Sequence, residues 1–167
     1  MIIKFRLGSW RFTFSMAPVV DIIGVNSKLP DGNHILMWDF DDVSFRKVRK
    51  ALEEIAWSWK LPRIYILETF PERNFIAYCF ARGSWQNVVQ IIASTDGIDP
   101  NFFKYGVYRE RFTLRVSRKC GRIPRLVHII ESEVPEDVQI PDLMSWVKYE
   151  TLPDNYLSKI FSWERQE

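Results

Sequence analysis

The first half of the chain contains three clear patterns of hydrophobic and polar positions. IIKFRL and WRFTF flank Leu7-Gly8-Ser9 and predict an N-terminal hairpin. The run ILMWDFD, beginning at Ile35, predicts a strand after a stretch rich in Pro, Gly and Asn. The next segment predicts a helix that ends at Leu61-Pro62. Its apolar residues recur at spacings of three and four and form one stripe: Phe45, Val48, Leu52, Ile55 and Trp59.

The second half continues with alternating strands and helices. RIYILE (63–68) and NFIAYCF (74–80) predict two strands, and Ser84 is a candidate N-cap for a helix through residue 92. Residues 94–110 are expected to be irregular, with a short helical turn at Asp99-Pro100. RFTLRVS (111–117) and LVHIIE (126–131) predict strands, and two short helices are expected at 143–149 and 156–163.

The predicted order from residue 34 onwards is βαββαβ(β), which indicates the α+β class. In an RRM-like or ferredoxin-like arrangement of this order, helices cover one face of an antiparallel sheet and leave the other open. We expect one domain over 1–167, in which 1–33 form a hairpin region, 34–130 the RRM-like core and 131–167 an acidic helical extension. That extension either docks a replication partner such as a helicase or packs as a helical cap. We expect the cap, through Leu143, Trp146, Leu157, Ile160 and Phe161.

Charge is distributed unevenly along the chain. Residues 1–130 hold 20 Lys and Arg against 12 Asp and Glu, whereas residues 131–167 hold 3 against 9. This asymmetry favours an anionic ligand for the body of the protein. The N-terminus lacks the uninterrupted apolar run of a signal peptide or membrane span, and two cysteines without CxxC spacing suit a reducing compartment. We therefore expect a cytoplasmic protein without a membrane partner.

Three aspartates follow the apolar part of the run that begins at Ile35. Side chains alternate along a strand, so Asp39 and Asp41 should lie on the open face while the large apolar side chains lie under the helices. Two carboxylates at this spacing can share a hard divalent cation such as Mg²⁺ or Mn²⁺. Asp42 is predicted to be the N-cap of the following helix.

A basic segment lies between Arg109 and Arg125, with seven cations and one acid, Glu110. Alternation in 111–117 places four of its residues in one outward row: Arg111, Thr113, Arg115 and Ser117. Guanidinium groups bind phosphate oxygens in pairs of hydrogen bonds. The nearby aromatic residues are able to stack on bases, and they are Phe102, Phe103, Tyr105 and Tyr108. Metal-binding acids beside phosphate-binding bases are the ingredients of nucleotidyl transfer.

Two segments resemble motifs of the archaeo-eukaryotic primase superfamily, in particular its primase-polymerase branch and the small members found on plasmids and viruses. MWDFD (37–41) is similar to the family's hDxD motif, which ends a strand before a helix, and GVYRERFTLRVSRK (106–119) is similar to its nucleotide-binding run. The resemblance covers roughly residues 34–130. Where the family carries an SxH motif, this chain has Asn74, Phe75, Ile76 and Ala77. Both histidines, His34 and His128, lie elsewhere and are expected to be structural.

The resemblance implies a template-dependent nucleotidyltransferase that uses Mg²⁺ or Mn²⁺ and nucleoside triphosphates. Asp39 and Asp41 would be the catalytic metal ligands, and the third acid of the family remains open among Asp96, Asp99 and Glu110. The nucleoside triphosphate would be bound by Arg111, Arg115, Ser117 and Lys119. The single-stranded template would contact Arg109, Arg118, Arg122 and Arg125.

Other readings of the same residues stay open. The first alternative is a non-catalytic module that binds single-stranded nucleic acid on an RRM-like sheet and needs no metal. DFDDV also fits the aspartate nucleophile of haloacid dehalogenase-type phosphohydrolases, although those enzymes need a parallel sheet and a later pair of aspartates. A nickase with a His-x-His metal site is disfavoured because the two histidines lie far apart.

Overall fold

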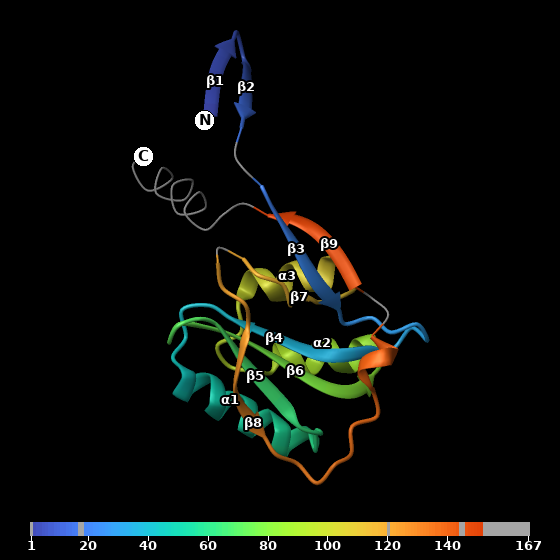
Figure 1. Ribbon diagram of the computed structural model, residues 1–167. Coiled ribbons are helices and arrows are strands. Elements are labelled where there is room, and N and C mark those ends of the chain that lie inside the picture. The colour runs from blue at the N-terminus through green and yellow to red at the C-terminus, as the bar shows by residue number, and fades with distance from the viewer. Residues whose placement is uncertain (1, 17–18, 120, 144–145, 152–167) are drawn as a thin grey trace.

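The computed structural model describes residues 2–16, 19–119, 121–143 and 146–151, and it is of the α+β class, as predicted (Figure 1). The strands in these residues are β1 (Ile2–Leu7), β2 (Trp10–Ser15), β3 (Val20–Asn26), β4 (His34–Phe40), β5 (Ile64–Phe70), β6 (Asn74–Gly83), β7 (Thr113–Arg115), β8 (Arg125–Ile130) and β9 (Trp146–Thr151). The helices are α1 (Phe45–Trp59), α2 (Trp85–Ala93), α3 (Pro100–Tyr108) and the 3-10 turn Ile140–Asp142. None of the helices in these residues combines the length and the apolar character needed to cross a bilayer.

The larger sheet has the order β4-β6-β5-β8, and its neighbouring strands are antiparallel. Trp38 is fully buried on the face that α1 and α2 cover, where its indole donates a hydrogen bond to the Thr95 hydroxyl at 2.8 Å. On the same face, Phe45 at the start of α1 packs against Phe75 of β6. Helices therefore cover one face of this sheet, as predicted, but the prediction that the other face is open is wrong: Met37 of β4 and Ile76 of β6 lie on that face and are buried.

Helix α1 follows the predicted apolar stripe and buries Val48, Leu52 and Ile55 against the sheet. It ends at Lys60, whose left-handed backbone (φ 50°) lets its N–H bond back to the last turn before Leu61-Pro62. Helix α2 begins as predicted at Ser84, whose hydroxyl accepts the backbone N–H of Asn87.

A second, three-stranded sheet has the order β7-β3-β9. No strand was predicted at β3, although β3 is the middle strand of this sheet. The prediction was also wrong at 143–149, where a helix was expected and β9 is found instead, paired antiparallel with β3. Val147 is half-buried and Lys148 exposed, an alternation that suits a strand. The helix expected at 156–163 lies outside the described residues.

The RRM-like detail of the prediction is not reproduced strand for strand. In the predicted order, β7 would complete the sheet that contains β4. It pairs instead with β3 of the second sheet, and β8 occupies the outer edge beside β5. The strand predicted over 111–117 is confined to Thr113–Arg115, because the N–H groups of Val116 and Ser117 both bond the carbonyl of Ile23 and interrupt the ladder.

Residues 94–110, expected to be largely irregular, contain α3. Asp99 caps this helix by accepting the N–H groups of Asn101 and Phe102, and Pro100 occupies its first turn. The helix packs closely on fully buried Phe112: a Cβ added at Gly106 would collide with the Phe112 ring. This contact fixes α3 beside β7 and places its N-terminus near the end of β4.

Candidate nucleotide and metal site

Asp39 lies near the C-terminal end of β4, with its side chain on the sheet face opposite Trp38. Its backbone carbonyl accepts the N–H of Asp99 at 2.8 Å, which joins the end of β4 to the start of α3. The pKa of the Asp39 carboxyl group is raised to about 8, mainly by burial and also by the carboxylates of Asp41 and Asp99, while the charge of Arg115 acts in the opposite direction. At neutral pH Asp39 therefore holds a proton unless a cation replaces it.

Asp41 and Asp42 have different surroundings. The side-chain amide of Asn74 donates to Asp41, and Arg73 forms an ion pair with Asp42. The prediction that Asp42 caps α1 is wrong: its backbone is left-handed (φ 58°), and the N-cap of α1 is Ser44, which makes no side-chain capping bond. The backbone N–H of Val43 bonds to the carbonyl of Arg73, so this loop is tied to the β5–β6 turn.

Asp99 is the candidate third acid that the fold brings to Asp39, since its charge acts on the Asp39 carboxyl group. Its carboxylate also caps α3. Asp96 and Glu110 are exposed, and neither is among the main groups that shift the pKa of Asp39. Within the described residues, no three His, Cys, Asp or Glu side chains approach closely enough to hold a metal ion by themselves.

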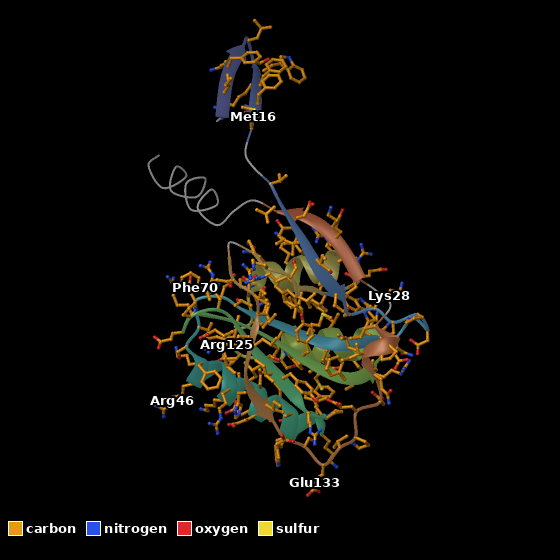
Figure 2. All side chains as sticks on the ribbon, in the orientation of Figure 1. Met16, Lys28, Arg46, Phe70, Arg125 and Glu133 are labelled. Carbon is orange, nitrogen blue, oxygen red and sulfur yellow. The ribbon has the colours of Figure 1, made fainter. Side chains whose placement is uncertain are left out.

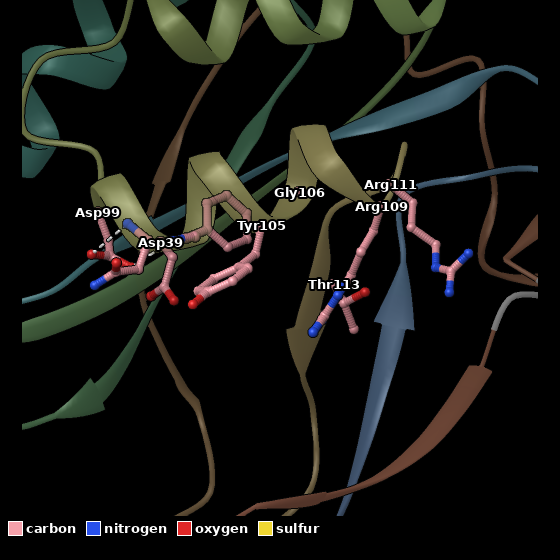
Figure 3. Close-up of a pocket in the computed structure, with 9 residues that line it drawn as sticks. Asp39, Asp99, Tyr105, Gly106, Arg109, Arg111 and Thr113 are labelled. Atoms are coloured by element: carbon pink, nitrogen blue, oxygen red, sulfur yellow. Dashed lines mark hydrogen bonds between the residues drawn. The ribbon is translucent and has the colours of Figure 1, made fainter. Parts of the chain in front are cut away.

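A pocket of about 200 Å³ adjoins Asp39 (Figure 3). The carboxylates of Asp39 and Asp99 lie at one end of it, close to Tyr105, while Arg109 and Arg111 extend from the other. The guanidinium of Arg109 lies 5.8 Å from the centre of the Tyr105 ring. The full lining is Asp39, Asp99, Asn101, Phe102, Tyr105, Gly106, Arg109, Arg111 and Thr113.

The pocket lining brings together residues for which different roles were predicted. Arg111, expected to bind nucleotide, lines it, and so does Arg109, expected to bind template. No role was predicted for Asn101, because the residues around it in the sequence do not indicate that α3 begins beside Asp39. Asp99-Pro100 was the available signal, since an acid before Pro is a common helix start.

Arg115, also expected to bind nucleotide, lies outside the pocket lining. Its guanidinium donates to the carbonyls of Thr69, Ser117 and Arg122 at 3.2 to 3.4 Å, and so joins β7 to β5 and to the basic turn. The hydroxyl of Ser117 accepts the N–H of Ile23 at 2.8 Å, which is a structural role. The backbone of Lys119 is paired with that of Arg122 across the turn.

Three of the expected template contacts, Arg118, Arg122 and Arg125, lie in this turn or just after it. The guanidinium of Arg122 lies over the Phe70 ring at 4.5 Å, and Arg125 pairs with Glu68 at 3.0 Å. Phe70 and Arg125 are labelled on the same side of the molecule in Figure 2. Arg118 is exposed.

Both histidines have structural surroundings, as expected. Buried His34 shares a hydrogen bond with the Ser27 hydroxyl at 2.9 Å and packs against Trp85, and burial lowers its pKa. His128 packs edge-on against Phe45, on the helix-covered face.

In comparisons with known proteins, no family model, no curated protein and no solved structure matches the chain. The strand pairings of both sheets are antiparallel, which disfavours the parallel architecture of the dehalogenase-type reading.

Proposed function

We propose that the protein is a primase-polymerase-like nucleotidyltransferase that acts on a single-stranded nucleic-acid template. The observation that carries this proposal is the pocket beside Asp39, where a protonated carboxyl group with two acidic neighbours lies at one end and two arginines at the other. Carboxylates at one end suit a hard cation, and guanidinium groups at the other suit phosphate oxygens.

The donor set fits Mg²⁺ or Mn²⁺ that arrives with a triphosphate. Mg²⁺ is usually bound through one or two carboxylates together with substrate phosphates and water, so a complete protein cage is not required. Asp39 and Asp41 would hold the ion, and Asp99 adds negative charge next to Asp39. When bound, the ion would neutralise charge on the triphosphate during nucleotidyl transfer.

The protein's own groups would orient the nucleotide. Arg109 and Arg111 would bind phosphate oxygens, and Tyr105 offers a ring beside the carboxylates. Arg115 would act indirectly, because it holds the basic turn in place and opposes the raised pKa of Asp39.

A template-extension assay tests this function. The protein is incubated with single-stranded template, with and without primer, together with nucleoside triphosphates and Mn²⁺. Asp39→Asn and Asp41→Asn should abolish product. Asp42→Asn is the matched control, because it removes a neighbouring carboxylate that pairs with Arg73, and it should retain product.

The second candidate is a non-catalytic module that binds single-stranded nucleic acid. It is favoured by the absence, among the described residues, of a three-residue metal-ligating group, and by Asn74 to Ala77 in place of a histidine motif. Strand binding that needs no metal, combined with no product from the wild type, would support this candidate against the enzyme.

A further inference from the structure

The N-terminal hairpin has one face made entirely of large apolar side chains. In the β1–β2 register Ile3 lies opposite Phe14, Phe5 opposite Phe12 and Leu7 opposite Trp10, so these six side chains share a face. Each is exposed, from 40% for Phe12 to 71% for Trp10. The ring of Phe5 is stacked on Phe12 at 5.0 Å and lies 5.8 Å from Phe14.

The hairpin stands apart from the two sheets in Figure 1, and in Figure 2 its side chains lie beyond Met16, away from the packed body. A two-stranded hairpin is marginally stable by itself in water. Exposed apolar clusters of this kind usually mark a binding surface. We therefore expect a ligand to cover the apolar face of the hairpin.

The charge of the hairpin indicates the nature of that ligand. Residues 1–20 contain three cations, Lys4, Arg6 and Arg11, and no acid. Arg6 and Arg11 are exposed and directly opposite each other in the register, where like charges destabilise a strand pair. The Arg6 guanidinium donates to the Gly8 carbonyl at 2.8 Å, which holds it near the tip of the hairpin. An anion bound there would relieve the repulsion.

We propose that the hairpin is a binding site for single-stranded nucleic acid. Its bases would stack on the aromatic face, and its phosphates would bind Arg6 and Arg11. This surface is separate from the pocket beside Asp39, and its binding requires neither metal nor catalysis.

Two other occupants account for fewer of the observations. From strand rise and spacing, the apolar face is roughly 20 Å long and about 10 Å wide. Two copies pressed together would bury on the order of 500 Å², below the roughly 1,000 Å² expected of a stable interface. An anionic membrane is planar, and it would leave the arginine face pointing away from the lipid phosphates. A flexible single strand can pass around the ribbon edge and reach both faces.

The test is fluorescence anisotropy of a labelled oligothymidylate of about 20 nucleotides, with EDTA present so that no metal contributes. Trp10→Ala/Arg11→Ala should weaken binding about tenfold, the loss expected for one stacked base, and should lower the salt slope by about 0.7. Lys50→Ala/Trp57→Ala is the matched control, since it removes an exposed cation and an exposed Trp from α1. It should change affinity by less than about twofold.

Each outcome decides the proposal. Unchanged binding by Trp10→Ala/Arg11→Ala would overturn it. The proposal would also be overturned if oligonucleotide binding by this variant stayed at the wild-type level while another property of the hairpin was lost. That property would be a dimer detected by light scattering or binding to phosphatidylserine vesicles. Should the variant not fold, Arg6→Gln/Arg11→Gln provides the same comparison. Failure of the template-extension assay with hairpin binding intact would count against the proposed enzyme alone.

Discussion

The backbone N–H of Asp99 donates to the backbone carbonyl of Asp39 at 2.8 Å, although the two residues are sixty positions apart. This bond joins the end of β4 to the first turn of α3 and brings two carboxyl groups into one electrostatic environment. Asp99 both caps the helix and raises the pKa of Asp39, and substitution can separate these two effects.

Asp99→Asn should lower the pKa of Asp39 from its value of about 8, because it removes a negative neighbour. Asn is also a good N-cap, so the stability of the protein should change little. Asp99→Ala should lower the same pKa and also cost about 1 kcal/mol in the free energy of unfolding, since the cap is lost. Carboxyl-carbon NMR titration and chemical denaturation measure the two effects. An unchanged Asp39 pKa in both variants would contradict this electrostatic coupling.

The stability of the protein should fall as the pH rises from about 4 to about 8. An unfolded Asp releases its proton near pH 4, whereas Asp39 in the folded chain keeps its proton to about pH 8. In this window the folded state holds the extra proton, so the free energy of unfolding decreases as the pH rises. The decrease is on the order of 3 kcal/mol once the partial solvent exposure of the Asp39 side chain is allowed for.

Denaturation at about pH 5 and about pH 8 measures this decrease. Asp39→Asn should remove most of it, and Asp42→Asn should retain it. An equal decrease in wild type and Asp39→Asn would assign the pH dependence to another group.

Gly106→Ala should destabilise the protein by about 2 kcal/mol, because the added methyl group would collide with the Phe112 ring and push α3 away from β7. Tyr108→Ala, at a position on the same helix that is 85% exposed, should have little effect on the midpoint of thermal unfolding. A stable Gly106→Ala variant would show that the helix can shift without cost.

Arg115→Gln should raise the pKa of Asp39 above about 8, since it removes the positive charge that opposes the neighbouring carboxylates. It should also speed amide hydrogen exchange in the basic turn, where the Arg115 guanidinium holds the Ser117 and Arg122 carbonyls. Arg118→Gln, at an exposed position in the same turn, is the control. If both variants exchange alike, the turn does not depend on Arg115.

Local periodicity was sufficient for part of the fold. The stripe from Phe45 to Ile55 predicted α1, and the register partners Phe5 and Phe12 lie in two runs whose alternation predicted the hairpin. In these cases the signal and the structure involve the same few residues. Asp42 does not cap α1. Its carboxylate forms an ion pair with Arg73, thirty-one positions later, and the local pattern does not reveal this contact.

Non-local contacts account for what the sequence reading missed. Strands β3 and β9 are separated by more than a hundred residues, and β9 joins its sheet through its pairing with β3. The pocket likewise needs α3 packed on Phe112 before Asn101 and Arg109 meet Asp39. The acidic pair was visible in the sequence, but its neighbours depend on that packing.

The most direct measurement of the central claim, that Asp39 binds a divalent cation together with a triphosphate, is calorimetric Mn²⁺ binding near neutral pH with a non-hydrolysable nucleoside triphosphate. Titrations in buffers of different ionisation enthalpy count the protons released. We expect binding to displace about one proton from Asp39, whose pKa is raised to about 8, and this release to disappear in Asp39→Asn and persist in Asp42→Asn. Mn²⁺ binding of equal strength and proton release in wild type and Asp39→Asn would contradict the claim.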